Sequence, residues 1–272
     1  MSIFDAGGLR VEYATLSRLG KRLVNEDACG YWVENTGACF IVSDGAGGNG
    51  GGDVASEMAV RTMLSAFSSS PTLESTQIED LIHRADAAVR YGQSLSQNLS
   101  RMSATVAALF FDAKAEYAQL GHLGDTRIYL FRRGQCYLMT KDHSLVQQFV
   151  DAGLLSDKST REHSERSVLF AALGGVKEFA ATVLDAPVKI EEGDVFLICS
   201  DGFWEAVEEE DMLNCLAQAD AAEEWLVRME QILIDKNCSE QDNYTALAVW
   251  AGSPNDITVH WSGMNLDNTK TS

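Results

Sequence analysis

Residues 40–48 read FIVSDGAGG and combine an apolar run, an acid and three glycines. The run Phe40, Ile41 and Val42 has the composition and length of a buried strand. It ends at Asp44, and the glycines beside this acid let main-chain carbonyls approach whatever the carboxylate binds. The stretch therefore indicates a site for a hard cation, although many ordinary strands also enter a turn through Asp-Gly.

Three other acids occupy comparable places at the ends of strand-like segments. Asp201 follows an apolar run in Ser-Asp-Gly, Asp125 follows a glycine between two strand-like segments, and Asp242 comes just before another. Acids at strand ends could converge on one edge of a sheet, where carboxylates without a cation would raise one another's pKa. The repeated design predicts that these acids share a cation site with Asp44.

Length and charge limit the class of protein. The chain has 272 residues, enough for one large domain or two small ones with a substantial core. Its 21 basic and 40 acidic residues give a net charge of −19. Nucleic acids and anionic membranes bind basic surfaces, so this charge argues against either as a partner.

The cysteines and the N-terminus favour a cytoplasmic protein. The six cysteines are scattered without a CxxC spacing, and two of them, Cys39 and Cys199, lie within apolar strand-like runs. We therefore expect reduced thiols that pack in the core. The N-terminal residues contain no apolar stretch of signal-peptide length, and no later stretch is suited to a membrane-spanning helix.

Hydrophobic periodicity divides the chain into groups of strands and groups of helices. The expected strands are residues 9–18, 29–33, 104–111, 116–122, 127–131, 135–139, 179–184, 195–200 and 244–250, and the expected helices are residues 50–67, 78–99, 208–218 and 221–234. Because strands and helices do not strictly alternate, the pattern favours stacked antiparallel sheets with helices outside.

Two segments fall outside this pattern. Residues 143–173 begin as a short helix, become polar at residues 156–167 and resemble an insertion, which could be a solvated loop or a flap that contacts substrate. We expect residues 1–252 to form one domain. Beyond it, residues 257–261 could add a strand before a disordered polar tail that ends at residue 272.

Eight short motifs resemble those of the metal-dependent serine/threonine protein phosphatases of type 2C. In chain order they are RLVNEDA from Arg22, SDGAGG from Ser43, SATV from Ser103, GDTR from Gly124, KDHS from Lys141, ALGG from Ala172, SDGFWE from Ser200 and DNYT from Asp242. The resemblance, closest to bacterial single-domain members, implies an α+β fold. That fold is a four-layer αββα sandwich of two antiparallel sheets flanked by helices.

The resemblance also implies a centre with two metal ions. Asp44 would bridge both ions, the carbonyl of Gly45 would bind the second ion, and Asp201 with Asp242 would complete the first. Ligands that are all oxygen atoms favour Mg²⁺ or Mn²⁺ over zinc. Two such ions can lower the pKa of a shared water, so that hydroxide attacks phosphorus without a covalent intermediate.

Four further residues take roles by the same resemblance. Glu26 and Asp27 would act partly through metal-bound water, and Asp125 would form a third, looser metal site with Asp201. Arg22 matches the phosphate-binding arginine, and its planar guanidinium suits the charged oxygens of a phosphoryl group. The predicted catalytic residues are therefore Arg22, Asp44 and Asp201.

One position departs from many eukaryotic relatives, which carry a histidine two residues after the bridging acid. This chain has Ala46 there. We therefore hypothesise that metal-bound water protonates the leaving group. His122 and His143 fall inside motifs, but we interpret them as packing or hydrogen-bonding residues.

Three functions are weighed against these observations. The first is a protein phosphatase that acts on phosphoserine and phosphothreonine of a protein substrate and opposes a serine/threonine kinase. The second is a non-catalytic phosphoprotein-binding protein with the same fold. The third is an acidic calcium-binding protein, which would supply closely spaced acids of the form DxDxDG, and the chain contains none. The complete set of acids favours the first.

Overall fold

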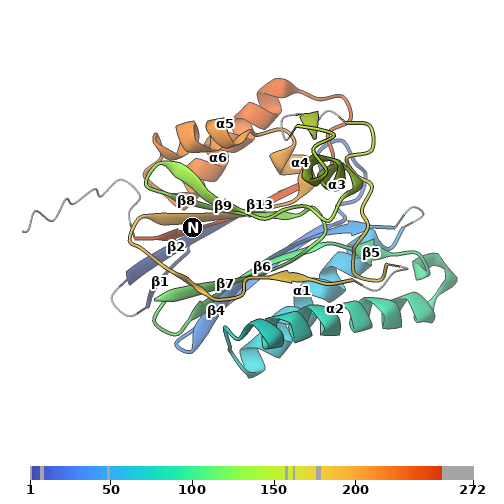
Figure 1. Cartoon of the computed structure of the whole chain (residues 1–272), viewed down its shortest axis with the longest axis horizontal. Coiled ribbons are helices and arrows are strands. Elements are labelled where there is room, and N and C mark those ends of the chain that lie inside the picture. Colours follow the sequence, from blue (N-terminus) through green and yellow to red (C-terminus); the bar gives the residue numbers. More distant parts are fainter. Residues whose placement is uncertain are drawn as a thin grey trace, which may run out of the picture.

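Two antiparallel sheets stack face to face with helices on both outer sides (Figure 1). The structure is a computed structural model that describes residues 2–6, 9–47, 50–156, 159–161, 163–175 and 179–252. This four-layer arrangement confirms the predicted αββα sandwich. The extra strand and tail expected within residues 253–272 lie outside the described residues.

One sheet has six strands and lies beneath helices α5 and α6. Its strands, in spatial order, are β1 (Ser2–Ala6), β2 (Leu9–Arg18), β13 (Tyr244–Ala251), β12 (Asp194–Cys199), β8 (Arg127–Arg132) and β9 (Gln135–Met139). The helices on this side are α4 (Asp201–Trp204), α5 (Glu209–Leu216) and α6 (Ala222–Lys236). Every pair of neighbouring strands is antiparallel.

The other sheet has seven strands and is covered by two long helices. Its main path is β10 (Thr182–Val183), β7 (Tyr117–Leu123), β6 (Val106–Asp112), β4 (Gly37–Ala46) and β3 (Asp27–Glu34), while β11 (Val188–Lys189) pairs with β7 and β5 (Ser103–Ala104) with β4. The covering helices are α1 (Gly52–Ser69) and α2 (Ser75–Leu95), followed by a 3-10 turn at Gln97–Leu99. Helix α3 (Leu145–Asp151) lies in the segment predicted as a flap.

Strand β4 is apolar at successive positions and does not alternate between apolar and polar residues, because both of its faces are covered. Phe40 and Val42 contribute to the core between the two sheets, whereas Cys39 and Ile41 contribute to the core under α1 and α2. Successive side chains of a strand point to opposite faces. Because both faces of β4 are covered, every position in the run is buried.

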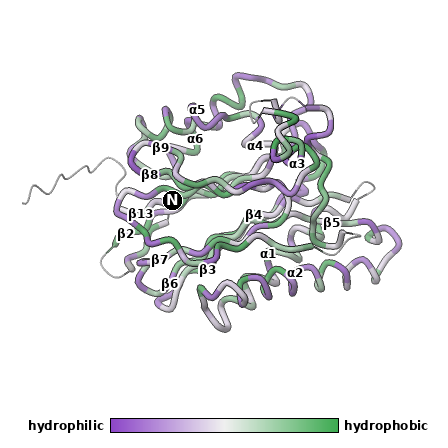
Figure 2. The backbone as a smooth tube through the Cα atoms, in the orientation of Figure 1, coloured by the Kyte–Doolittle hydropathy of each residue, from purple (hydrophilic) through white to green (hydrophobic). Residues whose placement is uncertain are grey.

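Helices α1 and α6 close the outer layers with large side chains. Trp225 of α6 lies edge-on to Phe131, with ring centroids 5.7 Å apart, and Phe67 of α1 packs 5.0 Å from Phe110. Hydrophobic stretches follow the paired sheets, while α2 alternates between hydrophobic and hydrophilic segments (Figure 2). The alternation is typical of a helix that buries one face.

Some predicted element boundaries were wrong. The strand expected over residues 179–184 is limited to Thr182–Val183, which pairs with β7 before the chain turns and pairs again as β11. The helix expected over residues 78–99 ends at Leu95, because Ser96 has extended backbone angles and starts the 3-10 turn. Both differences arise from tertiary pairing and local hydrogen bonds that hydropathy does not encode.

A membrane-crossing helix has to be long and apolar throughout. None of the helices in the described part of the chain meets both conditions.

We expect Phe40→Ala to lower the free energy of unfolding by about 3–5 kcal/mol, because it leaves a cavity between the sheets. Phe40 is fully buried and packs against Tyr13 and Phe111, with ring centroids 5.3 and 5.9 Å away. Urea denaturation measures the change. The matched control is Tyr91→Ala on the exposed side of α2, which should change stability by less than about 0.5 kcal/mol. Equal losses in both variants would contradict this account of the core.

Candidate metal centre and phosphate site

A cavity of about 300 Å³ lies where β4 and β12 end and β13 begins. Seven of the eight residues predicted for the site line it: Arg22, Glu26, Asp44, Gly45, Asp125, Asp201 and Asp242. The eighth, Asp27, is only 8% exposed and does not line the cavity. Folding therefore gathers acids that are up to 216 residues apart in the sequence, from 26 to 242, around one space.

Thr105 holds the backbone of Asp44 in place. The Asp44 N–H donates to Thr105 Oγ1 at 3.0 Å, and the Thr105 N–H donates to the Asp44 carbonyl at 2.8 Å. The hydroxyl of Ser43 donates to the Thr105 carbonyl at 2.6 Å. Strand β4 continues through Asp44 to Ala46, so this acid lies within a strand and not just after one.

Ser200 ties Asp27 to the other sheet. The Ser200 hydroxyl donates to Asp27 Oδ2 at 2.7 Å and accepts from the Thr245 N–H at 2.9 Å. Asp27 is the register partner of Asp44 in the β3–β4 pair. The next residue after Ser200, Asp201, begins α4. One serine thus links a strand of each sheet directly beside the candidate metal ligands.

Asn243 organises the loop that carries Arg22. Its Nδ2 donates to the carbonyls of Leu19 and Val24 at 2.9 and 3.0 Å, and its Oδ1 accepts from the Glu26 N–H at 2.8 Å. Arg22 Nη2 in turn donates to Asp242 Oδ2 at 2.7 Å. In the sequence, Asn243 stood out only as the second residue of the DNYT motif. Its three hydrogen bonds to the loop form a clamp, and the asparagine of DNYT was the sequence feature that could have predicted it.

Gly45 lies where no side chain would fit. Its N–H donates to the Glu26 carbonyl at 3.1 Å, and an added Cβ would collide with the backbone carbonyl of Gly52. The close approach of two backbone segments therefore requires glycine at this position. Gly45 also lines the cavity, beside Asp44.

Asp125 is held by aromatic and cationic neighbours that the sequence analysis did not identify. Trp204 Nε1 donates to the Asp125 carbonyl at 2.8 Å. The guanidinium carbon of Arg127 lies 3.4 Å from the centre of the Trp204 ring, and Arg127 also forms two 2.8 Å hydrogen bonds with Asp142. Arg127 is the last residue of GDTR and Trp204 is the tryptophan of SDGFWE. Neither residue type indicates a particular chemistry when its motif is seen in isolation.

Burial and mutual repulsion raise the pKa of the clustered acids. Burial is the largest cause for Asp44, Asp125 and Asp201, and repulsion from neighbouring carboxylates adds to it. Asp44 and Asp201 lie close enough for a hydrogen bond between their carboxyl groups. Burial also raises the pKa of Asp27 from 3.8 to about 7, although hydrogen bonds to Ser200 and Thr245 lower it.

The donor atoms of this cluster suit hard divalent cations. Asp27 Oδ1 and Asp201 Oδ1 are buried and have no hydrogen-bond partner among the described residues. In the same part of the chain, no three His, Cys, Asp or Glu side chains are arranged as a ready ligand set for one ion. Mg²⁺ typically takes one or two carboxylates and keeps several waters. The cluster therefore fits hydrated ions better than a closed protein cage.

The segment predicted as a flap borders the cavity. Within residues 143–173, apart from 157–158 and 162, which lie outside the described residues, Ser167, Leu169 and Ala172 line it. Backbone bridges join Ser144 to Leu169 and Leu173 to Ala104 of β5. These contacts place one edge of the segment beside the acids. Its movement stays a prediction.

The two histidines within motifs pack against each other, and of the two only His143 has a side-chain hydrogen bond among the described residues. Their ring centroids are 4.8 Å apart. His143 Nδ1 accepts from the Gly124 N–H at 3.1 Å, whereas His122 is fully buried and its pKa is lowered to about 3, mainly by burial. His122 is therefore neutral near pH 7.

Residues 16–242 match the family model described as Protein phosphatase 2C. The chain belongs to the protein phosphatase 2C family. The match extends over both sheets and includes every residue that lines the 300 Å³ cavity except Asn243. Family membership thus agrees with the resemblance seen in the eight motifs.

Members of this family with curated names are similar to most of the chain. The serine/threonine protein phosphatase PstP of Mycobacterium tuberculosis is 31% identical over 260 residues, 92% of this chain, and the chain spans only 44% of that protein's length. The serine/threonine phosphatase stp of Listeria monocytogenes is 32% identical over 235 residues, 83% of this chain and 89% of its own length.

A solved family structure has the same fold. The crystal structure of the catalytic domain of PstP in complex with two manganese ions superposes with a TM-score of 0.75 at 26% identity. The superposition covers 90% of this chain and 99% of that domain.

The raised pKa of Asp27 predicts that the metal-free protein loses stability as pH rises. Between 3.8 and about 7 the folded chain holds a proton on Asp27 that the unfolded chain has released. The free energy of unfolding therefore falls across this window. We expect Asp27→Asn to lose less stability than the unaltered protein between pH 4 and 7, measured by urea denaturation in EDTA.

Asp80→Asn on the exposed face of α2 is the control for this experiment, because it should keep the pH dependence of the unaltered protein. An Asp27→Asn variant with that same dependence would contradict the assignment of a raised pKa to Asp27. Addition of Mn²⁺ to the unaltered protein should reduce the loss of stability between pH 4 and 7, since bound cations offset carboxylate repulsion.

Proposed function

We propose that this protein is a metal-dependent phosphatase that hydrolyses phosphoserine and phosphothreonine in proteins. The observation that carries the proposal is the convergence of Arg22, Asp44 and Asp201 on one cavity with four further predicted site residues. The names of the family's curated relatives, PstP and stp, support the same activity.

The metal ligands are assigned from this geometry and from the family. Asp44, the Gly45 carbonyl, Asp201 and Asp242 would hold the two ions, with Asp44 placed to be shared between them. Glu26 contributes through water from the cavity wall. Asp27 acts from behind the wall, where its Oδ2 accepts a hydrogen bond from Ser200.

Two divalent ions bound there would lower the pKa of a shared water and offset the charge on phosphoryl oxygens. The chain supplies the remaining functions. Arg22 lies beside Asp242 with a guanidinium that can bind two phosphoryl oxygens at once. Ala46 is exposed and has no proton to give, so the leaving oxygen takes its proton from water in the cavity. This extends the hypothesis made from the sequence.

Metal identity, a third ion and the biological setting belong to the proposal as well. The two manganese ions of the related PstP structure support Mn²⁺ or Mg²⁺. Asp125 and Asp201, whose carboxylates repel each other, would hold a third ion more loosely. The six thiols are all free, which favours a cytoplasmic protein that opposes a serine/threonine kinase.

A non-catalytic phosphoprotein-binding role is the second candidate. Such a protein could lose one or more ligand carboxylates without consequence for binding. Here all six predicted carboxylates are present, and all six lie around or beside the cavity. The catalytic function is therefore favoured.

The deciding experiment is hydrolysis of a phosphothreonine peptide with Mn²⁺ and with EDTA. We expect activity with Mn²⁺ and none with EDTA. Asp201→Asn should reduce kcat/KM by at least about 100-fold, because it removes charge from the metal ligand set. The control Asp80→Asn should retain full activity. Binding of the peptide without turnover in the unaltered protein would instead favour the non-catalytic alternative.

Arg22→Gln should reduce kcat/KM by about 100-fold, since a charged donor to the phosphoryl group is lost. Arg22→Lys keeps the charge but loses the planar fork, so it should restore only part of the activity. Steady-state kinetics on the same peptide measures both. Arg84→Gln, which breaks an exposed pair with Asp80 on α2, is the control for loss of an arginine. An Arg22→Lys variant as active as the unaltered protein would show that the fork is not needed.

A further inference from the structure

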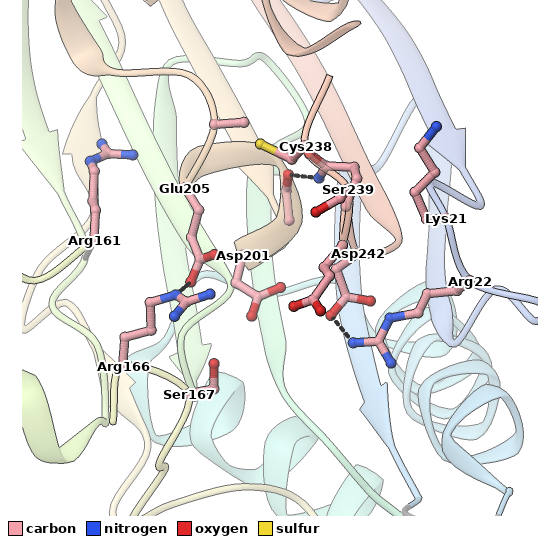
Figure 3. A pocket seen from close by; sticks show the side chains of 14 residues that line it. Lys21, Arg22, Arg161, Arg166, Ser167, Asp201, Glu205, Cys238, Ser239 and Asp242 are labelled. Atoms are coloured by element: carbon pink, nitrogen blue, oxygen red, sulfur yellow. Dashed lines mark hydrogen bonds and ion pairs between the residues drawn. The ribbon is translucent and has the colours of Figure 1, made fainter. Parts of the chain in front are cut away.

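A second, larger cavity adjoins the candidate metal centre (Figure 3). Its volume is about 830 Å³, and it shares Arg22, Ser167, Asp201 and Asp242 with the smaller cavity. Its other walls come from α4, residues 238–241 and the predicted flap. We call it the side cleft. A protein segment with its phosphoryl group at the metal centre would have this cleft beside it.

The side cleft gathers basic side chains in a strongly acidic protein. Four line it: Lys21, Arg22, Arg161 and Arg166. Figure 3 shows Lys21 and Arg22 on one side of Asp201 and Asp242, with Arg161 and Arg166 on the other. The chain as a whole has a net charge of −19. Four acids, Asp201, Glu205, Glu240 and Asp242, line the same cleft, so its attraction for an anionic group depends on individual cations that no acid pairs with.

Ion pairs already engage the three arginines. The pairs are Arg22 with Asp242 at 2.7 Å, Arg161 with Glu209 at 2.7 Å and Arg166 with Glu205 at 2.5 Å. Lys21 forms no ion pair within the described ranges. Glu240 also lines the cleft, and no ion pair joins it to Lys21 there. The ammonium group of Lys21 is thus available to a partner.

The backbone around Lys21 is held rigidly. The Lys21 N–H donates to the Gln241 carbonyl at 2.8 Å, and the Arg22 N–H donates to the Leu19 carbonyl at 3.1 Å. Gly20 has φ of +58°, and a Cβ there would collide with the Asp242 carbonyl. This turn sets Lys21 directly beside the arginine proposed to bind phosphate. Figure 3 shows the Lys21 side chain pointing away from Asp242 and the Arg22 guanidinium, so a group that contacts its ammonium lies some way along the cleft from the phosphoryl group.

The same loop also has the features of a surface that meets protein. Leu23 and Val24 follow Arg22 and leave their side chains 98% and 53% exposed. Apolar side chains so close to a binding cleft gain from being covered by a partner. A small phosphate ester would not reach them, whereas an extended peptide advances by about 3.3–3.6 Å per residue and could cover them.

We propose that Lys21 is a specificity-determining residue that binds a carboxylate of the substrate within about three residues of the phosphorylated side chain. This inference rests on the proposed phosphatase function and adds a substrate class to it: phosphosites flanked by aspartate or glutamate. A second phosphoryl group would offer similar charge, so the experiment separates it from a carboxylate.

The test compares kcat/KM for matched phosphothreonine peptides that carry glutamate or glutamine at each flanking position. The unaltered protein should prefer a glutamate peptide by about two- to five-fold, the range expected for an exposed ion pair. The preference should shrink in about 0.5 M salt. Lys21→Met should abolish it, and Lys21→Glu should reverse it. Because each ratio is measured within one protein preparation, partial misfolding does not alter it.

Two charge variants serve as controls. Lys114→Glu makes the same change in net charge as Lys21→Glu. Lys114 lies in the turn between β6 and β7, at the opposite end of these strands from Thr105, so this variant should keep the preference for glutamate. Glu240→Gln removes an acid from the side cleft and should increase it.

An unchanged glutamate preference in Lys21→Met would overturn the inference. So would a preference for a doubly phosphorylated peptide with none for glutamate, which would assign Lys21 to phosphate. If the unaltered protein hydrolysed no peptide with Mn²⁺, the proposed function would fail first and this inference with it.

Discussion

Repulsion between buried carboxylates is the constraint on which the rest of the structure depends. Asp44, Asp125 and Asp201 are brought together in surroundings that disfavour their charged forms. Without cations, the folded protein must either hold protons on these groups or tolerate their repulsion. The stacked sheets supply the rigidity that keeps the acids in place. A flexible scaffold would let them separate, and the proposed cation site would be lost.

Hydrogen bonds between elements distant in the sequence provide that rigidity. Thr105 fixes Asp44, Ser200 links Asp27 to β13, and Asn243 clamps the loop of Arg22. Each of these side chains connects two or more backbone segments. These side chains are uncharged, so they contribute by positioning the charged residues of the site. The same clamp orders the loop that carries both Lys21 and Arg22, so the proposed contacts to phosphate and to flanking residues share one support.

The basic side chains of the side cleft contrast with the acidic character of the chain as a whole. A net charge of −19 disfavours anionic partners in general, yet basic side chains surround the candidate centre. Four acids line the same cleft, so its basic side chains attract an anionic segment only over short distances. The pairing of the arginines with Glu205 and Glu209 leaves a cleft that is ordered as well as charged.

The amino-acid sequence by itself determined the layers and the acids. Runs such as residues 40–42 are apolar at every position because both faces of the strand are covered, and the acids that follow such runs indicated the candidate centre. Tertiary structure alone decided that Asp27 lies behind the cavity wall and that Trp204 holds Asp125. These depend on strand register and on contacts between segments far apart in the chain, and hydropathy and motif spacing record neither.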